Sequence, residues 1–240
     1  MASSCSPNPQ GPVAGLVPVA RAGGGQRWLV TLTPEASRGY TAATLQATAI
    51  IERRLGPAVV ANRIHAGRPE PWRRARARWR RDLAAAVREG SAAAAFKGDV
   101  SDCYGSIAPG LVGRRLLASG ADADAVRAVI TFLHACADQG MRGLPVGPHA
   151  SGILANVVLA VVDDHLRSAG LRHRRWVDDV VVAAPTMAGA TAAHDAFRRA
   201  LDELGLLPSP AKTHVLADPM DVASLAAGWK ISTAGAGAVG

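Results

Sequence analysis

Lysine, cysteine and aromatic residues are scarce in this chain of 240 residues. Only three of its 27 basic residues are lysines, aromatic residues make up 4% of the chain, and the three cysteines are Cys5, Cys103 and Cys136. Because the cysteines are odd in number and lack CxxC spacing, we expect free thiols in a reducing compartment and no disulfide framework. The seven histidines show no metal-ligand spacing either, so we expect no histidine metal site.

Long hydrophobic runs are missing as well. The longest apolar run, Ile153 to Val162, is too short to span a bilayer and contains Asn156. The N-terminus has no basic region followed by a hydrophobic one, so we expect no secretory signal. These absences predict a cytoplasmic protein.

Arginine and alanine are abundant instead. A hydrophobic fraction of 49% in 240 residues suffices for a globular protein of one large or two small domains. The net charge of +8 and the pI of about 10.4 favour an acidic partner, and arginine binds phosphate through its bidentate fork. From composition alone, a drift towards alanine and arginine explains the same values equally well.

Periodicity and turn signals predict helices and strands after a disordered tail, rich in Ser, Pro and Gly, over residues 1–26. The predicted strands are Trp28–Thr33, Ala92–Val100, the runs on either side of Asp178-Asp179, and a short strand within Leu206–Leu216. The predicted helices are Thr41–Leu55, Trp72–Glu89, Val112–Leu117, Asp124–Ala137, Ala150–Ser168 and Thr186–Leu204, the last ending at Gly205. This order resembles a split βαβ arrangement, an antiparallel sheet with helices on one face, and therefore an α+β fold.

The helix predicted over Trp72–Glu89 carries the strongest run of positive charge. Its arginines fall on every face, so it is not an ordinary amphipathic helix with one solvated side. The spacing of Trp72 and Trp79 allows one stripe to pack on the protein while the arginines face a nucleic-acid backbone. The candidate nucleic-acid contacts are Arg73, Arg74, Arg76, Arg78, Arg80 and Arg81. A merely solvated helix is the alternative.

Two adjacent carboxylates, Asp178 and Asp179, lie between two short runs rich in valine and tryptophan that are typical of strands. This pattern indicates a tight hairpin that projects acids from the edge of a sheet. Asp99 follows another hydrophobic strand, although by itself it would be an ordinary strand-end acid. Neighbouring carboxylates repel and need cations, and oxygen ligands suit Mg²⁺. We therefore expect Asp99 and Asp178 to share a magnesium site.

A rival carboxylate pair, Asp163-Asp164, lies inside a predicted helix. Adjacent helix positions point about 100° apart, which serves a single metal ion poorly. We expect this pair to be exposed at the end of the helix.

Four motifs follow one another in the second part of the chain. In Gly98–Ile107 an aromatic residue stands five positions after the aspartate and is followed by Ser-Ile. Gly143–Asn156 contains the pattern Leu-Pro-x-Gly-x-x-x-Ser-x-x-Leu-Ala-Asn, and Trp176–Asp179 is an aromatic-x-Asp-Asp box. Gly205–Leu207 and Pro210–Thr213 contain Gly-Leu and then Lys-Thr. In type, order and spacing these motifs resemble those of bacterial reverse transcriptases, such as group II intron, retron and abortive-infection enzymes.

The resemblance implies a right-hand polymerase palm over residues 96–218. A reduced, helical fingers-like region containing the arginine-rich helix would occupy residues 27–95, and residues 219–240 would be a C-terminal stub without a thumb. Such enzymes are RNA-directed DNA polymerases that add dNTPs to a primer 3′-hydroxyl with two Mg²⁺ ions, for which Mn²⁺ substitutes. The implied partners are an RNA template, a nucleic-acid primer and dNTPs, and an accessory protein or oligomer in place of the thumb.

The resemblance also implies roles for individual residues. Asp99 and Asp178 would be the principal metal ligands, the Val100 carbonyl a third, and Asp179 an auxiliary acid of the same catalytic and metal site. The remaining roles concern the nucleotide: Tyr104 would be the gate that excludes a ribose 2′-hydroxyl, Gly147 would lie under the nascent base pair, and Lys212 would stand near the incoming triphosphate. A core tyrosine and a solvated lysine are the ordinary alternatives for Tyr104 and Lys212.

Some positions depart from the family pattern. Trp176 replaces the usual Tyr or Phe before the acids, and Val146 stands where many members have Gln. The Pro148–Ser151 variant of the second motif is closer to a divergent, defence-associated branch, which implies a mobile element or antiphage defence as the setting. Two further hypotheses stay open: a catalytically weakened palm that binds RNA or a protein partner, and another palm nucleotidyltransferase, either an RNA polymerase or a template-independent enzyme.

Overall fold

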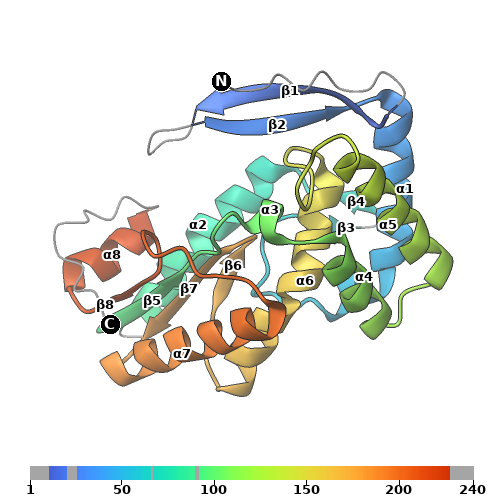
Figure 1. Cartoon of the computed structure of the whole chain (residues 1–240). Coiled ribbons are helices and arrows are strands. Elements are labelled where there is room, and N and C mark those ends of the chain that lie inside the picture. The colour runs from blue at the N-terminus through green and yellow to red at the C-terminus, as the bar shows by residue number, and fades with distance from the viewer. Residues whose placement is uncertain (1–10, 21–25, 66, 90–91, 228–240) are drawn as a thin grey trace. The chain divides into compact units, whose positions relative to one another are not determined.

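The computed structural model describes residues 11–20, 26–65, 67–89 and 92–227 (Figure 1). The chain divides into two compact units. The first unit draws on residues 1–54 and 103–158, and the second on residues 55–102 and 159–240. Within the described residues, no helix has the length and apolar character needed to cross a membrane.

The first unit is mostly helical. Its strands are β1 (Val13–Ala20) and β2 (Gln26–Leu32), and its helices are α1 (Pro34–Arg54), α3 (Cys103–Ser106), α4 (Pro109–Ala118), α5 (Ala123–Ala137) and the first half of α6 (His149–Ser168). Tyr40 of α1 stacks on Phe132 of α5 with ring centroids 4.0 Å apart. The predicted start of α5 is confirmed, because the Asp122 side chain accepts a hydrogen bond from the Ala125 N–H. Cys103 and Cys136 are buried free thiols, as expected.

The expectation of a disordered tail over residues 1–26 is wrong for residues 13–20. These residues form β1, which pairs antiparallel with β2 from Val13–Leu32 to Ala20–Gln26. Val13 is buried against Val30 and Cys136, and its N–H donates to the Gln139 side chain at 2.9 Å. A tertiary partner therefore orders a segment whose composition alone favours disorder. Residues 1–10, 21–25 and 228–240 lie outside the described residues, and with them the first part of the predicted tail and most of the predicted C-terminal stub.

A four-stranded antiparallel sheet forms the centre of the second unit. Its strands are β5 (Ala94–Gly98), β6 (Arg174–Trp176), β7 (Asp179–Ala184) and β8 (His214–Leu216), in the order β6-β7-β5-β8. The unit also contains β3 (Ile64–His65), β4 (Arg68–Pro69), α2 (Trp72–Glu89), α7 (Met187–Leu204), α8 (Pro219–Ala227) and the second half of α6. Helix α7 ends at Gly205 in the left-handed conformation, as predicted.

Helices cover both faces of this sheet, rather than the single face expected from the sequence. Phe96 of β5 packs on Phe197 of α7 with ring centroids 5.4 Å apart. The neighbouring Ala95 is buried with Trp79 of α2 and Leu225 of α8. Because successive residues of a strand point to opposite faces, α7 covers one face and α2 with α8 covers the other (Figure 1). The predicted split βαβ arrangement with an antiparallel sheet is confirmed.

Candidate functional site

Asp99 directly follows β5 and is almost fully buried, with 4% of its surface exposed. The segment after α7 holds its main chain: the Ser209 N–H donates to the Asp99 carbonyl at 2.8 Å, and the Thr213 hydroxyl donates to the same oxygen at 3.3 Å. The Ser101 N–H donates to the Leu207 carbonyl at 2.8 Å. The first and fourth sequence motifs, far apart in the chain, therefore lie side by side.

Lys212 reaches the Asp99 carboxylate from this segment. Its ammonium group donates to Asp99 Oδ2 at 3.0 Å, while 58% of the lysine side chain stays exposed. Asp99 is thus paired with a cation that remains accessible to a ligand.

The predicted hairpin is confirmed: it consists of β6, a turn and β7, with Asp178 in the turn and Asp179 at the start of β7. Trp176 pairs with Asp179, so Val177 and Asp178 form a two-residue turn between the strands. Val177 has a φ of 55°, whereas Asp178 is not among the residues with positive φ. These signs are those of a type II′ turn, whose first central position is normally glycine. The hairpin presents both acids where β7 begins.

Asp178 and Asp179 lie in surroundings that raise the pKa of both carboxyl groups. Burial, followed by the negative charges of Asp179 and Asp99, raises the pKa of Asp178 to about 7. The pKa of Asp179 is also raised, by burial and then by Asp99. Negative charge is therefore concentrated at this end of the sheet and is only partly compensated.

Lys97 also belongs to this site, although the sequence analysis did not predict it as a site residue. It is 4% exposed, and burial lowers its pKa while the charges of Asp179 and Asp99 act in the opposite direction. Lys97 precedes Asp99 by two residues, and strand alternation places residues i and i+2 on the same face. A lysine inside an otherwise apolar strand was the signal that could have identified it.

The chemistry of the acids fits a divalent cation. Among the described residues, no three Asp, Glu, His or Cys side chains already stand together as a metal-binding group. The donors present are nevertheless carboxylate oxygens, the ligands that hard cations such as Mg²⁺ prefer. A cation would also relieve the repulsion that raises the pKa of Asp178. Whether these acids hold a metal stays a prediction.

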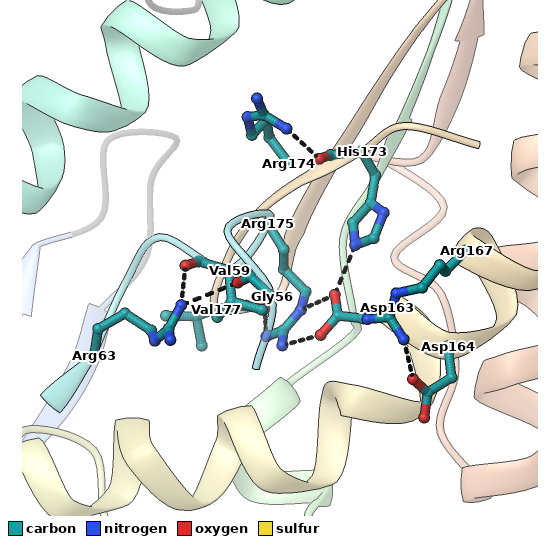
Figure 2. Close-up of polar contacts among 10 residues, drawn as sticks. All are labelled: Gly56, Val59, Arg63, Asp163, Asp164, Arg167, His173, Arg174, Arg175 and Val177. Atoms are coloured by element: carbon teal, nitrogen blue, oxygen red, sulfur yellow. Dashed lines mark hydrogen bonds and ion pairs between the residues drawn. The ribbon is translucent and has the colours of Figure 1, made fainter. Parts of the chain in front are cut away.

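The expectation that Asp163 and Asp164 form an exposed pair is wrong for Asp163. Only 2% of Asp163 is exposed, and its carboxylate lies between the His173 ring and the Arg175 guanidinium (Figure 2). Asp164 is exposed as expected and binds Arg167 at 2.7 Å. Adjacent residues point in different directions around a helix, so one carboxylate enters the core of the second unit while the other faces solvent.

An open groove of about 600 Å³ runs along the arginine-rich helix α2. It is lined by Trp72, Arg73, Arg76, Ala77, Arg80 and Trp176. The Arg76 guanidinium lies 5.3 Å from the centroid of the Trp176 ring, which makes a cation–π contact. Trp79 is buried as expected, but Trp72 is 66% exposed and does not pack on the protein. The groove combines positive charge with two aromatic rings.

The arginines of α2 differ in their surroundings. Arg78 donates to the buried Glu70 carboxylate at 2.7 Å and to the Val60 carbonyl at 2.9 Å. Four others are exposed: Arg73, Arg74, Arg80 and Arg81. Among the residues that the structure describes, no ion pair involves Arg73 or Arg80. The charges of these two are available to an anionic ligand, whereas that of Arg78 is already compensated.

Tyr104 and Gly147 belong to the first unit, and the acids, Lys212 and the arginines belong to the second. The Leu144 N–H donates to the Tyr104 carbonyl at 2.8 Å, so the second motif is attached to the short helix α3. Gly147 has a φ of 123°, and a Cβ there would stand 3.2 Å from the Val30 carbonyl oxygen. Glycine is thus required locally, and the roles proposed for both residues in nucleotide binding stay predictions.

Two comparisons with known proteins give a match. The family model described as "Reverse transcriptase (RNA-dependent DNA polymerase)" matches residues 24–226. The fold is similar to that of an apo telomerase from Candida tropicalis truncated from its C-terminal domain, with a TM-score of 0.51 and 12% identity. The match covers 87% of this chain and 51% of the telomerase chain, so this chain spans about half the length of that protein. No curated protein sequence gives a significant match.

Proposed function

This chain belongs to the reverse transcriptase family, and on that premise we propose that it is an RNA-directed DNA polymerase that adds dNTPs to the 3′-hydroxyl of a primer. The observation that carries the proposal is the gathering of Asp99, Asp178 and Asp179 at one end of the sheet, where burial and then the charges of Asp179 and Asp99 raise the pKa of Asp178 to about 7. Carboxylates that repel one another at the end of a palm sheet are suited to binding divalent cations.

The acids would hold two Mg²⁺ ions through their carboxylate oxygens, with the Val100 carbonyl as a further ligand. When bound, such a pair lowers the pKa of the attacking hydroxyl and neutralises charge on the leaving pyrophosphate. Lys212, which is exposed and contacts Asp99, would compensate the charge of the incoming triphosphate or donate a proton to the leaving group. The buried Lys97 balances part of the negative charge while the site is empty.

The groove along α2 is the surface that we propose for the template and primer. Its arginines would bind phosphates and release counterions, and Trp72 and Trp176 offer rings on which bases stack. Mobile-element mobility or antiphage defence is the biological setting that we propose. We propose an accessory protein or a second copy of the chain as a further partner.

The proposal is tested by primer extension with purified protein, Mg²⁺ or Mn²⁺, and a primed RNA template. All four dNTPs and all four NTPs are supplied in separate reactions, with and without template. We expect template-dependent extension with dNTPs. Asp99→Ala and Asp178→Ala should each reduce it by at least about a thousand-fold, because each removes a charge that binds the metals. Asp164→Ala, which removes an exposed acid bound to Arg167, is the matched control.

The other outcomes identify the alternative functions. Extension with NTPs would indicate an RNA polymerase, and extension without template a template-independent transferase. RNA binding without extension under any condition would favour a palm that has lost its catalytic role. Full activity of Asp99→Ala or Asp178→Ala would contradict the metal assignment.

The preference for dNTPs tests Tyr104. If its ring excludes the 2′-hydroxyl, Tyr104→Ala should reduce the ratio of dNTP to NTP incorporation by about ten-fold or more, while Tyr104→Phe should keep it. The measurement is kcat/KM for each nucleotide in single-nucleotide extension. An unchanged ratio in Tyr104→Ala would assign the ring to the core of the first unit only.

A further inference from the structure

Val177 has a backbone conformation that a β-branched residue rarely adopts. Its φ of 55° lies in the left-handed region, and its side chain is buried. Such a conformation is strained and persists only where surrounding contacts impose it. Val177 immediately precedes Asp178, so whatever imposes this conformation also sets the direction of the candidate metal ligands.

Arg175 makes the side-chain contact that reaches this turn. Its Nη1 donates to the Val177 carbonyl at 2.9 Å, and its Nε and Nη2 donate to the two oxygens of Asp163 at 2.8 and 2.6 Å. His173 Nε2 lies 2.9 Å from Asp163 Oδ1. Arg175 is fully buried, with 0% exposed, and Asp163 and His173 are 2% and 5% exposed. Figure 2 shows the Asp163 carboxylate between the His173 ring and the Arg175 guanidinium.

The main chain of Arg175 is fixed as well. Its N–H donates to the Ala58 carbonyl at 2.8 Å, and its carbonyl accepts from the Val60 N–H at 2.9 Å. Arg63 holds this neighbouring loop together, because its guanidinium donates to the Leu55, Gly56 and Val59 carbonyls, each at 3.0 Å. Figure 2 shows the contacts with Gly56 and Val59. With both its main chain and its side chain held, Arg175 presents its Nη1 to the turn from a rigid base.

We propose that Asp163, His173 and Arg175 form a clamp that positions the catalytic turn: the Asp163–Arg175 ion pair aims the guanidinium at the Val177 carbonyl and thereby orients Asp178 and Asp179. These three are positioning residues, and the inference rests on the proposed role of the two acids. An arginine suits the task because its planar fork binds both carboxylate oxygens and retains a third N–H for the turn, which a lysine cannot do.

The test is a double-mutant cycle between the clamp and the strained residue. Arg175→Lys keeps the charge but loses the fork, and Val177→Gly removes the strain because glycine adopts positive φ readily. Wild type, both single variants and the double variant are compared by Mn²⁺ binding in electron paramagnetic resonance, by kcat and KM for dNTP, and by thermal unfolding. Arg167→Lys, which alters the exposed pair with Asp164, is the matched control.

We expect Arg175→Lys to weaken Mn²⁺ binding and to lower kcat by about ten-fold or more, with KM for dNTP changed by less than about three-fold. Val177→Gly alone is the reference for the double variant, so that the effect of Arg175→Lys is measured both with and without the strained valine. The double variant should regain most of the lost kcat and Mn²⁺ affinity, because a glycine turn no longer needs the clamp. Arg167→Lys should change none of these values.

Two results would overturn the proposal. One is an Arg175→Lys protein that unfolds at a lower temperature but binds Mn²⁺ and turns over like wild type, which would leave the cluster a stabilising role only. The other is an equal loss in Arg175→Lys and in the double variant. If Arg175→Lys does not fold, the same cycle and the same criteria apply to His173→Gln, which removes one contact of Asp163 and leaves the ion pair.

Mn²⁺ binding requires no polymerisation, so it separates this inference from the proposed function. A wild-type protein that binds Mn²⁺ but extends no primer contradicts the proposed function, and the cycle then tests the clamp on Mn²⁺ affinity alone. A wild-type protein that binds no Mn²⁺ overturns the clamp, because there is then no metal site to position.

Discussion

Asp163 and Asp178 are the same kind of residue in the same compact unit, yet their carboxyl groups ionise in opposite ways. Burial alone would raise the pKa of Asp163, but the charge and hydrogen bonds of Arg175, with those of His173, lower it to about 2. Burial and the neighbouring acids Asp179 and Asp99 instead raise the pKa of Asp178 to about 7. Burial favours the neutral form of both, and the partners decide the difference.

The contrast separates two uses of charge in one unit. At Asp163 the charge is neutralised by the bidentate contact with Arg175. This ion pair serves to hold the β6–β7 hairpin in place. At Asp178 the charge is left partly uncompensated, which costs stability and, on the proposed function, would provide affinity for a cation. A compensated buried charge therefore indicates a structural support, and an uncompensated one indicates a binding site.

The largest effect that would sharpen this comparison is on the activity of Asp178→Asn. Primer extension should fall by at least about a thousand-fold, while the free energy of unfolding should rise by about 1 kcal/mol because repulsion among the acids is relieved. Extension kinetics and thermal unfolding of the metal-free protein measure the two effects. A clear loss of stability would show that Asp178 is compensated after all.

Asp163→Asn should behave in the opposite way. Removing one partner of a buried ion pair leaves Arg175 with an uncompensated charge, so stability should fall by about 3–5 kcal/mol. Asp164→Asn changes the next residue, whose ion pair is exposed, and should cost less than about 1 kcal/mol. Chemical denaturation of both variants provides the comparison, and equal effects would contradict the buried pair.

Acid should weaken the Asp163 contribution in a defined window. Because the folded-state pKa is lowered to about 2, this contribution is fully present above the unfolded value near 3.8 and is lost as the pH falls towards 2. The loss should amount to about 2 kcal/mol. Between pH 5 and 2 the free energy of unfolding should therefore fall more steeply with decreasing pH for wild type than for Asp163→Asn. An equal pH dependence of the two proteins would contradict this contribution of Asp163.

The smallest effects concern the arginines of α2, where the same contrast recurs. Arg80→Gln removes an exposed charge at the groove and should reduce the slope of log affinity for RNA against log salt by about 0.7–0.9. Arg78→Gln breaks the pair with Glu70 and should lower stability with little change in that slope. Salt titrations of RNA binding by the two variants measure both slopes. Equal slopes in the two variants would remove the groove from the proposed interface.

The sequence predicted much of the second unit because its signals are local. The strands beside Asp178-Asp179, the arginine-rich helix and the end of α7 at Gly205 each follow from periodicity, charge or a glycine within a few residues. The contact between Asp99 and Lys212 was not predicted, because the motif resemblance implied only that Lys212 stands near the incoming triphosphate. Family membership was predicted from four motifs in order.

Other features depended on partners that no local pattern identifies. Strand β1 is ordered by β2, although its own composition predicts a tail. Lys97 was not predicted as a site residue, because its role depends on the charges of the nearby acids, and the sequence does not show that these acids lie close to it.

The sequence by itself determined which carboxylates this protein has and which of them follow strands. Only the tertiary structure decided that the charge of Asp163 is compensated by Arg175 and supports the fold. It likewise decided that the charge of Asp178 is only partly compensated, which makes Asp178 a candidate metal ligand. The physical reason is that ionisation depends on the charges and hydrogen bonds that surround a group in space. Arg175 belongs to the same short run as the acids, but its guanidinium turns inward to Asp163 and leaves Asp178 without it.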